Sequence, residues 1–331
     1  MDALNGLVAW LAKQQFHDAK GLLPPGLRIQ YHSRSDEHSK QLGELIVQDL
    51  LDTCPLLAEH AAAGRTVYGI NLPHVWSNGK VKTLDVAIGT PLAKRTSNFG
   101  ARIDKVTGGR NSTSLARLLV AIEEKATMTE HSKAQPRMFS ELNDAHTIIH
   151  QGDRWTISGG IEMLNISPTF ISPLRQRPDQ ALDITQHNQP QVTRNMVQHL
   201  RKLPQRDEVG DVGLDAYCTF VINLDNQGHV SLHEGPPAPQ PGDIDHYQTF
   251  LQRICRFYTE RFAYLDKLPS VEALSVEDAL AKVSRDYRGL LPQVGQLAVD
   301  AGLPGAAELD AVLLGVEVQQ HGEPPEVEEE A

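Results

Sequence analysis

Two apolar runs of this 331-residue sequence carry charged side chains: Thr83-Leu-Asp-Val-Ala-Ile-Gly89 and Leu118-Leu-Val-Ala-Ile-Glu-Glu-Lys-Ala126. Runs of this length that are rich in Val, Ile and Leu are typical of buried β-strands. Successive side chains of a strand point to opposite faces of its sheet, so we expect Glu123 and Lys125 on one face and Glu124 on the other. Because charges in an apolar run are costly unless they are paired or used, the pattern favours a functional role over a solvated surface.

The side chains of Asp85, Glu123 and Lys125 together fit a magnesium site. Mg²⁺ prefers oxygen ligands, usually one or two carboxylates with water and substrate phosphates, which Asp85 and Glu123 would supply. The backbone carbonyl of Glu124 is a further candidate ligand. A bound Mg²⁺ acidifies water and neutralises charge on a phosphate, and Lys125 would orient that water or hold the phosphate. We therefore expect Mg²⁺ as the cofactor, with Mn²⁺ able to take its place.

The elements around these runs follow a defined order: helix, three strands, the strand with Glu123, helix, strand. Apolar spacing predicts the two helices, and β-branched runs predict the strands. The turn pair Asn78-Gly79 predicts a β-hairpin whose second strand ends at Asp85. The other elements are expected at residues 39–51 (helix), 66–70 (strand), 118–126 (strand), 135–151 (helix) and 155–166 (strand).

An acidic residue on one strand, followed by Glu-x-Lys on the next, resembles the PD-(D/E)XK or restriction-endonuclease-like nucleases. The matching residues are Asp85 and Glu123-Glu124-Lys125, while Thr83-Leu84 stand where the family has its proline. The resemblance covers residues 41–166. It implies an α/β fold with a restriction-endonuclease-like core, in which a central mixed β-sheet is flanked by helices and followed by a helical C-terminal extension.

The resemblance also implies further site residues and partners. In many such nucleases a glutamate on the helix before the hairpin reaches the metal, and Glu44 occupies that place. Lys133 and Arg137, with Lys94 and Arg95 in the polar loop, are candidate DNA contacts. The implied activity is Mg²⁺-dependent hydrolysis of phosphodiester bonds in DNA, most simply double-stranded, by a restriction or phage-defence enzyme. A homodimer is implied too, with a companion methyltransferase or defence-system subunit as a further partner.

The charge distribution supports a local nucleic-acid surface. The whole chain has a net charge of −11, which argues against general coating of nucleic acid. Between Lys80 and Arg137, however, eleven residues are basic and five are acidic. Lysine and arginine contacts to phosphates supply most non-specific affinity for DNA, so a basic region around the candidate site is what a backbone groove requires. An ordinary solvated loop with uneven charge is the alternative.

Composition and patterning set the outer limits. Three widely spaced cysteines, Cys54, Cys218 and Cys255, fit reduced thiols of a cytoplasmic protein. The N-terminal apolar run is too short for export or membrane spanning, so we expect no membrane association. The expected organisation is an N-terminal helical segment, a nuclease-like domain, a helical region and an acidic disordered tail, at residues 1–38, 39–265, 266–318 and 319–331.

Other functions remain open at this point. One is a nuclease effector released by a partner and acting on RNA or single strands. Another is a catalytically silent DNA-binding or assembly module with the same fold. His146 and His150 lie four residues apart on an expected helix, but Thr147 stands where a zinc protease has glutamate, so core or surface histidines are the favoured interpretation.

Overall fold

The computed structural model describes residues 2–16, 28–76, 81–91, 102–107, 115–177 and 181–267. The chain divides into two compact units, Met1–Ser270 and Val271–Ala331. The second unit lies outside the described residues, as do the predictions for the helical region and tail from residue 268 onward. No helix among the described ranges is both long and apolar enough to cross a membrane.

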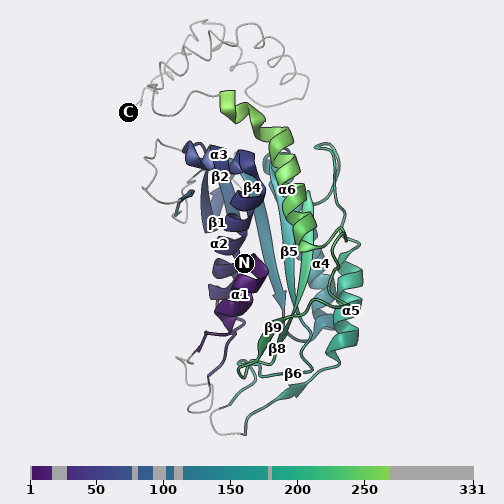
Figure 1. The fold of residues 1–331 in the computed structure, drawn as a ribbon. Coiled ribbons are helices and arrows are strands. Elements are labelled where there is room, and N and C mark those ends of the chain that lie inside the picture. Colours follow the sequence, from purple (N-terminus) through teal and green to yellow (C-terminus); the bar gives the residue numbers. More distant parts are fainter. Residues whose placement is uncertain are drawn as a thin grey trace, which may run out of the picture. The chain divides into compact units, whose positions relative to one another are not determined.

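A seven-stranded mixed sheet forms the centre of the first unit (Figure 1). Neighbours β4, β5 and β8 are parallel, as are β1 and β3, whereas β1/β2, β2/β4 and β8/β9 are antiparallel. In spatial order the strands are β3 (Asp104–Lys105), β1 (Val67–Val75), β2 (Val81–Pro91), β4 (Leu115–Thr127), β5 (Ile157–Asn165), β8 (Ala216–Leu224) and β9 (Val230–Leu232). A second, two-stranded sheet pairs β6 (Thr169–Phe170) with β7 (Thr185–Gln186).

Helices cover both faces of the sheet. The first face packs in one core with α1 (Ala3–Leu11), α2 (Glu37–Thr53), α3 (Pro55–Ala62) and α6 (Tyr247–Phe262). The second packs with α4 (His131–Gly152) and α5 (Gln189–Leu200). A short 3₁₀ helix, η1 (Ala263–Lys267), follows α6. We call these the α2 face and the α4 face. The expected α/β fold with helices flanking a mixed sheet is thus confirmed.

The local sequence explains the elements that carry the candidate site. In α2, buried Leu42, Ile46 and Leu50 recur every four residues and form the stripe that packs on the sheet. All nine residues of β5 are buried, as expected for an apolar strand in the middle of a parallel segment. Parallel strands need a long crossover, and α4 provides it between β4 and β5.

The alternation of side chains is interrupted where Asn71 of β1 lies opposite Asp85 of β2. Ile70 packs in the core of the α2 face, yet Leu72, two residues later, packs in that of the α4 face. The partner strand repeats the change, with Val86 on the α2 face and Leu84 on the α4 face. Asn71 has a φ of 48°, a left-handed conformation that side chains other than glycine adopt rarely. This irregularity sets the local position of Asp85.

Most of the expected elements are confirmed. The helix and strand predictions at 39–51, 118–126, 135–151 and 155–166 correspond to α2, β4, α4 and β5. Three strands precede β4 as predicted, but they are divided differently: residues 67–70 and the run from His74 belong to the single strand β1, and the third strand is the short β3 after β2. The second hairpin strand does not end at Asp85, because β2 continues through it to Pro91. The turn Asn78-Gly79 lies outside the described residues.

Candidate active site

Asp85 lies where β2 and β4 separate. The backbone pairing of these strands runs from Pro91 to Val86, which pairs with Ile122. Beyond this pair, the side chain of Asp85 replaces the backbone pairing: its Oδ2 accepts the backbone N–H of Glu124 at 2.7 Å. The carboxylate thus replaces a main-chain acceptor and bridges the opening where the backbone pairing of the two strands ends.

Glu123 and Lys125 form an ion cluster with Lys82 on the α4 face. The Lys125 Nζ lies 2.6 Å from Glu123 Oε1, and the Lys82 Nζ lies 2.8 Å from Glu123 Oε2. Lys125 also approaches Glu141 of α4 at 3.7 Å. Glu123 is buried, whereas the side chains of both lysines keep about a fifth of their surface exposed. The expected placement of Glu123 and Lys125 on one face is therefore confirmed.

Burial and electrostatic repulsion perturb the pKa of the Asp85 carboxyl group beside this cluster. Burial and the nearby Glu123 raise the pKa of Asp85 to about 6, against the opposing effects of the Glu124 N–H and the lysines. Burial acts to lower the pKa of Lys125, but attraction to Glu123 and Asp85 outweighs it and the pKa is raised. The lysine therefore stays charged while Asp85 resists losing its proton. Two close carboxyl groups of this kind favour a cation between them.

The donor set at this opening fits a hard cation. Asp85 and Glu123 provide two carboxylates, a common number for Mg²⁺, which fills its other positions with water and phosphate oxygens. In an extended strand the N–H and C=O of one residue leave the same edge, so the Glu124 carbonyl faces Asp85, as its N–H does. Within the described part of the chain, no group of three or more His, Cys, Asp or Glu side chains is arranged to hold a metal.

Glu124 projects to the α2 face, opposite Glu123 and Lys125. It is 8% exposed, and both of its carboxyl oxygens are buried without a hydrogen-bond partner among the described residues. Burial, reinforced by Asp85 and Glu123, raises the pKa of Glu124 well above its ordinary value. Gly43 of α2 makes room for it, because a Cβ there would lie 3.1 Å from Oε1. Sequence reasoning assigned a role only to the backbone of this residue.

Glu44 is not brought together with Glu123 and Lys125. It lies on α2, where it accepts a hydrogen bond from the Tyr68 hydroxyl and pairs with Lys105. Tyr68 belongs to the core of the α2 face, so Glu44 and the Glu123–Lys125 pair lie on opposite faces of the sheet. The sequence correctly placed Glu44 on a helix. It did not show that this helix packs on the face of β4 opposite Glu123 and Lys125, because that depends on strand register.

The candidate DNA contacts are placed only in part. Lys133 and Arg137 are on α4, with 79% and 70% of their side chains exposed. Lys133 pairs with Glu130, and Arg137 pairs with Glu141, the same glutamate that approaches Lys125. These two residues thus lie on the helix that covers the ion cluster. Lys94 and Arg95 lie outside the described residues.

Sequence reasoning missed Lys82 and Glu162. Lys82 precedes Asp85 by three residues and pairs with Glu123, and nothing in its local pattern distinguishes it from a surface lysine. Glu162 lies on β5 opposite Lys125 and is fully buried. Its Oε1 accepts the Thr127 hydroxyl at 2.7 Å, and burial raises its pKa to about 8. Its charge within the apolar strand 157–165 was a signal of the same kind as that of Glu123.

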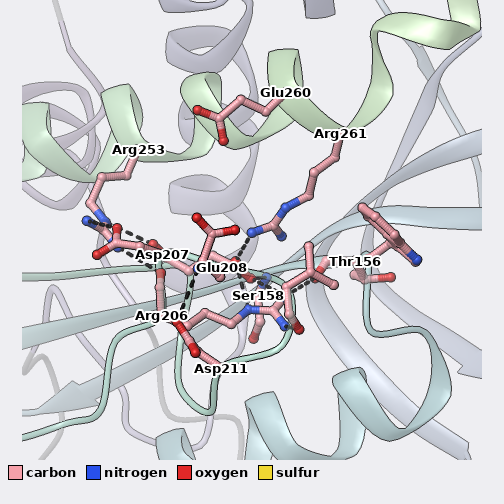
Figure 2. A network of polar contacts seen from close by, with 12 residues as sticks. Thr156, Ser158, Arg206, Asp207, Glu208, Asp211, Arg253, Glu260 and Arg261 are labelled. Carbon is pink, nitrogen blue, oxygen red and sulfur yellow. Dashed lines mark hydrogen bonds and ion pairs between the residues drawn. The ribbon is translucent and has the colours of Figure 1, made fainter.

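A second buried charged cluster lies toward the amino-terminal ends of β5 and β8, where Asp215 is fully buried. Its carboxylate accepts the Ser158 N–H and hydrogen bonds from Arg206 and Arg261. Figure 2 shows these two arginines approaching from the loop after α5 and from α6. His150 Nε2 lies 3.4 Å from the same carboxylate. All these partners belong to the protein interior, so the cluster joins the loop and α6 to the sheet.

Comparisons of the chain with family models, with curated proteins and with solved structures gave no match.

Proposed function

We propose that this chain is a Mg²⁺-dependent endonuclease that hydrolyses phosphodiester bonds in DNA, in the manner of a restriction or phage-defence enzyme. The observation that carries the proposal is the gathering of Asp85, Glu123 and Lys125 where β2 and β4 separate. Two carboxylates and a protonated lysine at an opening in a rigid sheet are suited to holding a cation beside a phosphate. The resemblance to the PD-(D/E)XK nucleases supports the same conclusion.

The carboxylates of Asp85 and Glu123, with the backbone carbonyl of Glu124, would hold the ion. When bound, Mg²⁺ supplies neutralisation of charge at the scissile phosphate and acidifies a water molecule. The raised pKa of Asp85 agrees with this assignment, because a nearby cation would stabilise the carboxylate that burial and Glu123 destabilise. Lys82 pairs with Glu123 from the β2 side and orients its carboxylate.

Lys125 would act on the substrate directly. Its ammonium group donates to Glu123, and an ammonium has three donors, so further donors would be available to a phosphate oxygen or to the attacking water. The side chain as a whole keeps a fifth of its surface exposed. Its raised pKa keeps it charged, which suits stabilisation of negative charge in the transition state. Arg137 and Lys133, exposed on α4, would contact the DNA backbone on the same side of the sheet.

Cleavage of unmethylated plasmid and phage DNA by the purified chain tests the proposal. We expect cutting with Mg²⁺, none with EDTA, and a loss of at least about 100-fold in the Lys125→Ala protein, the size of effect seen when a group that stabilises transition-state charge is removed. Lys202→Ala, at an exposed residue just after α5, is the matched control and should cut normally.

Other outcomes would overturn the proposal in defined ways. Cutting of RNA or single strands but not duplex DNA would identify the effector-type nuclease. Binding of DNA without Mg²⁺-dependent cutting would identify a silent binding module. Cutting of both strands at one site would further favour a homodimer, whose two-fold symmetry matches that of the duplex, and gel filtration with and without DNA would measure it.

A further inference from the structure

Charged side chains of alternating sign lead outward from the candidate active site on the α4 face. Glu123 pairs with Lys125 of β4, and Lys125 approaches Glu141 of α4. Glu141 in turn pairs with Arg137 of the same helix. The exposed fraction of the side chain rises along this row, from 8% for Glu123 to 20% for Lys125, 41% for Glu141 and 70% for Arg137. The row therefore connects the buried end of the site with the solvent.

The carboxylate of Glu141 lies between two cations that come from different elements. Its Oε2 lies 3.7 Å from Lys125 Nζ, and its Oε1 lies 3.6 Å from Arg137 Nε. Both distances exceed those of ordinary N–H···O hydrogen bonds, about 2.7–3.2 Å, whereas Lys125 Nζ lies 2.6 Å from Glu123. Two exposed ion pairs of this kind hold Glu141 only weakly, and its side chain can turn into water, where the carboxylate stays solvated.

An anion held between these two cations marks a place that suits a phosphate. Lysine and arginine bind the oxygens of carboxylates and of phosphates with the same charge-assisted hydrogen bonds. Lys125 is also the residue proposed to act at the scissile phosphate, so an anion beside it lies where the substrate backbone must pass. The Arg137 side chain is mostly exposed and lines a cavity of about 180 Å³, which gives it room to move toward an incoming ligand.

We propose that the Glu141 carboxylate occupies the place at which Lys125 and Arg137 bind a backbone phosphate of the substrate, and that the substrate displaces it. In the free protein the carboxylate supplies the negative charge that faces the two cations. It therefore competes with DNA for them and repels an approaching phosphate. The exchange turns the Glu141 side chain into water and breaks no covalent bond. The inference rests on the proposed nuclease function, because it takes the anion to be a phosphate of the DNA that is cut.

Equilibrium binding of a fluorescein-labelled DNA duplex in EDTA tests this place without requiring cleavage. Glu141→Gln keeps the size of the side chain and removes its charge. We expect it to bind the duplex roughly tenfold more tightly than the wild type, the effect of removing a like charge at contact distance in a largely solvated site. Glu260→Gln is the matched control, because Glu260 is also an exposed partner of an arginine four residues away, on α6. Its affinity should stay within about twofold of the wild type, since salt screens a distant exposed charge.

Substitution of Arg137 separates a shared binding place from general repulsion between Glu141 and DNA. Arg137→Gln should weaken binding of the duplex, because one of the two cations that hold the phosphate is lost. In that background the gain from Glu141→Gln should fall below about threefold, since the effects of residues that share a partner are not additive. General repulsion would instead give the same gain with and without Arg137.

Four results would overturn the inference: an unchanged affinity in Glu141→Gln, an equal gain in Glu260→Gln, a full gain without Arg137, or no binding by either the wild type or Glu141→Gln. Thermal unfolding of each variant confirms that the protein tested is folded. The nuclease proposal fails separately, by absence of Mg²⁺-dependent cutting. Tighter binding by Glu141→Gln through Arg137, without any cutting by the wild type, would retain the phosphate place and lose the nuclease.

Discussion

Replacing Asp215 by asparagine is expected to destabilise the protein strongly. The carboxylate accepts the Ser158 N–H at 2.8 Å, two bonds from Arg206 at 2.9 and 3.0 Å, and one from Arg261 at 2.6 Å. Arg206 is 1% exposed and the Arg261 side chain 4%, so neither guanidinium can turn to water when its counter-charge is lost. The Asp215→Asn substitution would therefore leave two buried cations without an anion.

The expected cost follows from that geometry. Removing one partner of a buried ion pair costs about 3–5 kcal/mol, a large part of the roughly 5–15 kcal/mol that stabilises a typical domain. Arg206 keeps bonds to the carbonyl groups of Arg154, Thr156 and Val209, which places our expectation near the middle, at about 4 kcal/mol. For a domain of this size that corresponds to a fall in Tm of roughly 8–16 °C.

Urea denaturation followed by circular dichroism measures this cost. Asp207→Asn is the matched control, because that carboxylate also pairs with two arginines, Arg253 and Arg256, but the Asp207 side chain is 68% exposed. Figure 2 shows Asp207 beside Arg253. An exposed pair contributes at most about 1 kcal/mol, so the control should remain near wild type. A loss below about 1 kcal/mol for Asp215→Asn, equal to the control, would refute the reasoning that burial determines the cost.

Four further predictions follow from the same contacts. Burial acts to raise the pKa of Asp215, but hydrogen bonds from His150, Arg206 and Arg261 outweigh burial and lower the pKa. The stability that ionised Asp215 contributes should therefore be present above about pH 4 and be lost as the pH falls further. Acid titration of wild type and Asp215→Asn checks this prediction, because the variant should lack that pH-dependent loss. Burial raises the pKa of Glu162 to about 8, so the stability of the wild type should decline between about pH 4.5 and pH 8 relative to that of Glu162→Gln. Urea denaturation at pH 5 and pH 8 should show the two proteins differing only at the higher pH. Asp85 must lose its proton to hold a cation, so Mg²⁺-dependent cleavage should rise with pH through about 6, and a rate independent of pH between 5 and 7 would contradict this assignment. Glu124→Leu removes a buried carboxyl group that has no partner among the described residues, and its free energy of unfolding should rise by about 1–3 kcal/mol in urea, whereas a loss of stability would show that the group is paired.

Local pattern was enough to predict the elements that carry the candidate site. The run from Leu118 to Ile122 is continuously apolar, and β4 forms there; the strand alternation also placed Glu123 and Lys125 on one face. The spacing of Leu42, Ile46 and Leu50 likewise fixed α2. These features depend on neighbours close in sequence, which is why a single chain reveals them.

The remaining features depend on contacts between distant segments. β2 separates from β4 at Asp85, which lies opposite Asn71 of β1, a residue with a left-handed backbone. An asparagine within a strand sequence does not by itself predict that conformation. The placement of Glu44 away from Glu123 follows from which face of β4 meets α2. Asp215 meets Arg261, 46 residues later, and Ser158, 57 residues earlier. No periodicity in the sequence predicts such contacts between distant residues.

The side chain of Asn226 contacts the N-terminal segment, so this contact can form only after most of the chain has been synthesised. Its side chain accepts the backbone N–H groups of Gln30 and Tyr31 and donates to the Tyr31 carbonyl, across about 195 residues. Beyond it, α6 supplies Phe250, Ile254 and other residues that cover the same face as α1 and α2. During synthesis the first two helices therefore leave the ribosome long before their partners exist. The α2 face lacks the cover of α6 until residue 262 emerges, and a chain released before that point would expose the apolar residues of this core to water.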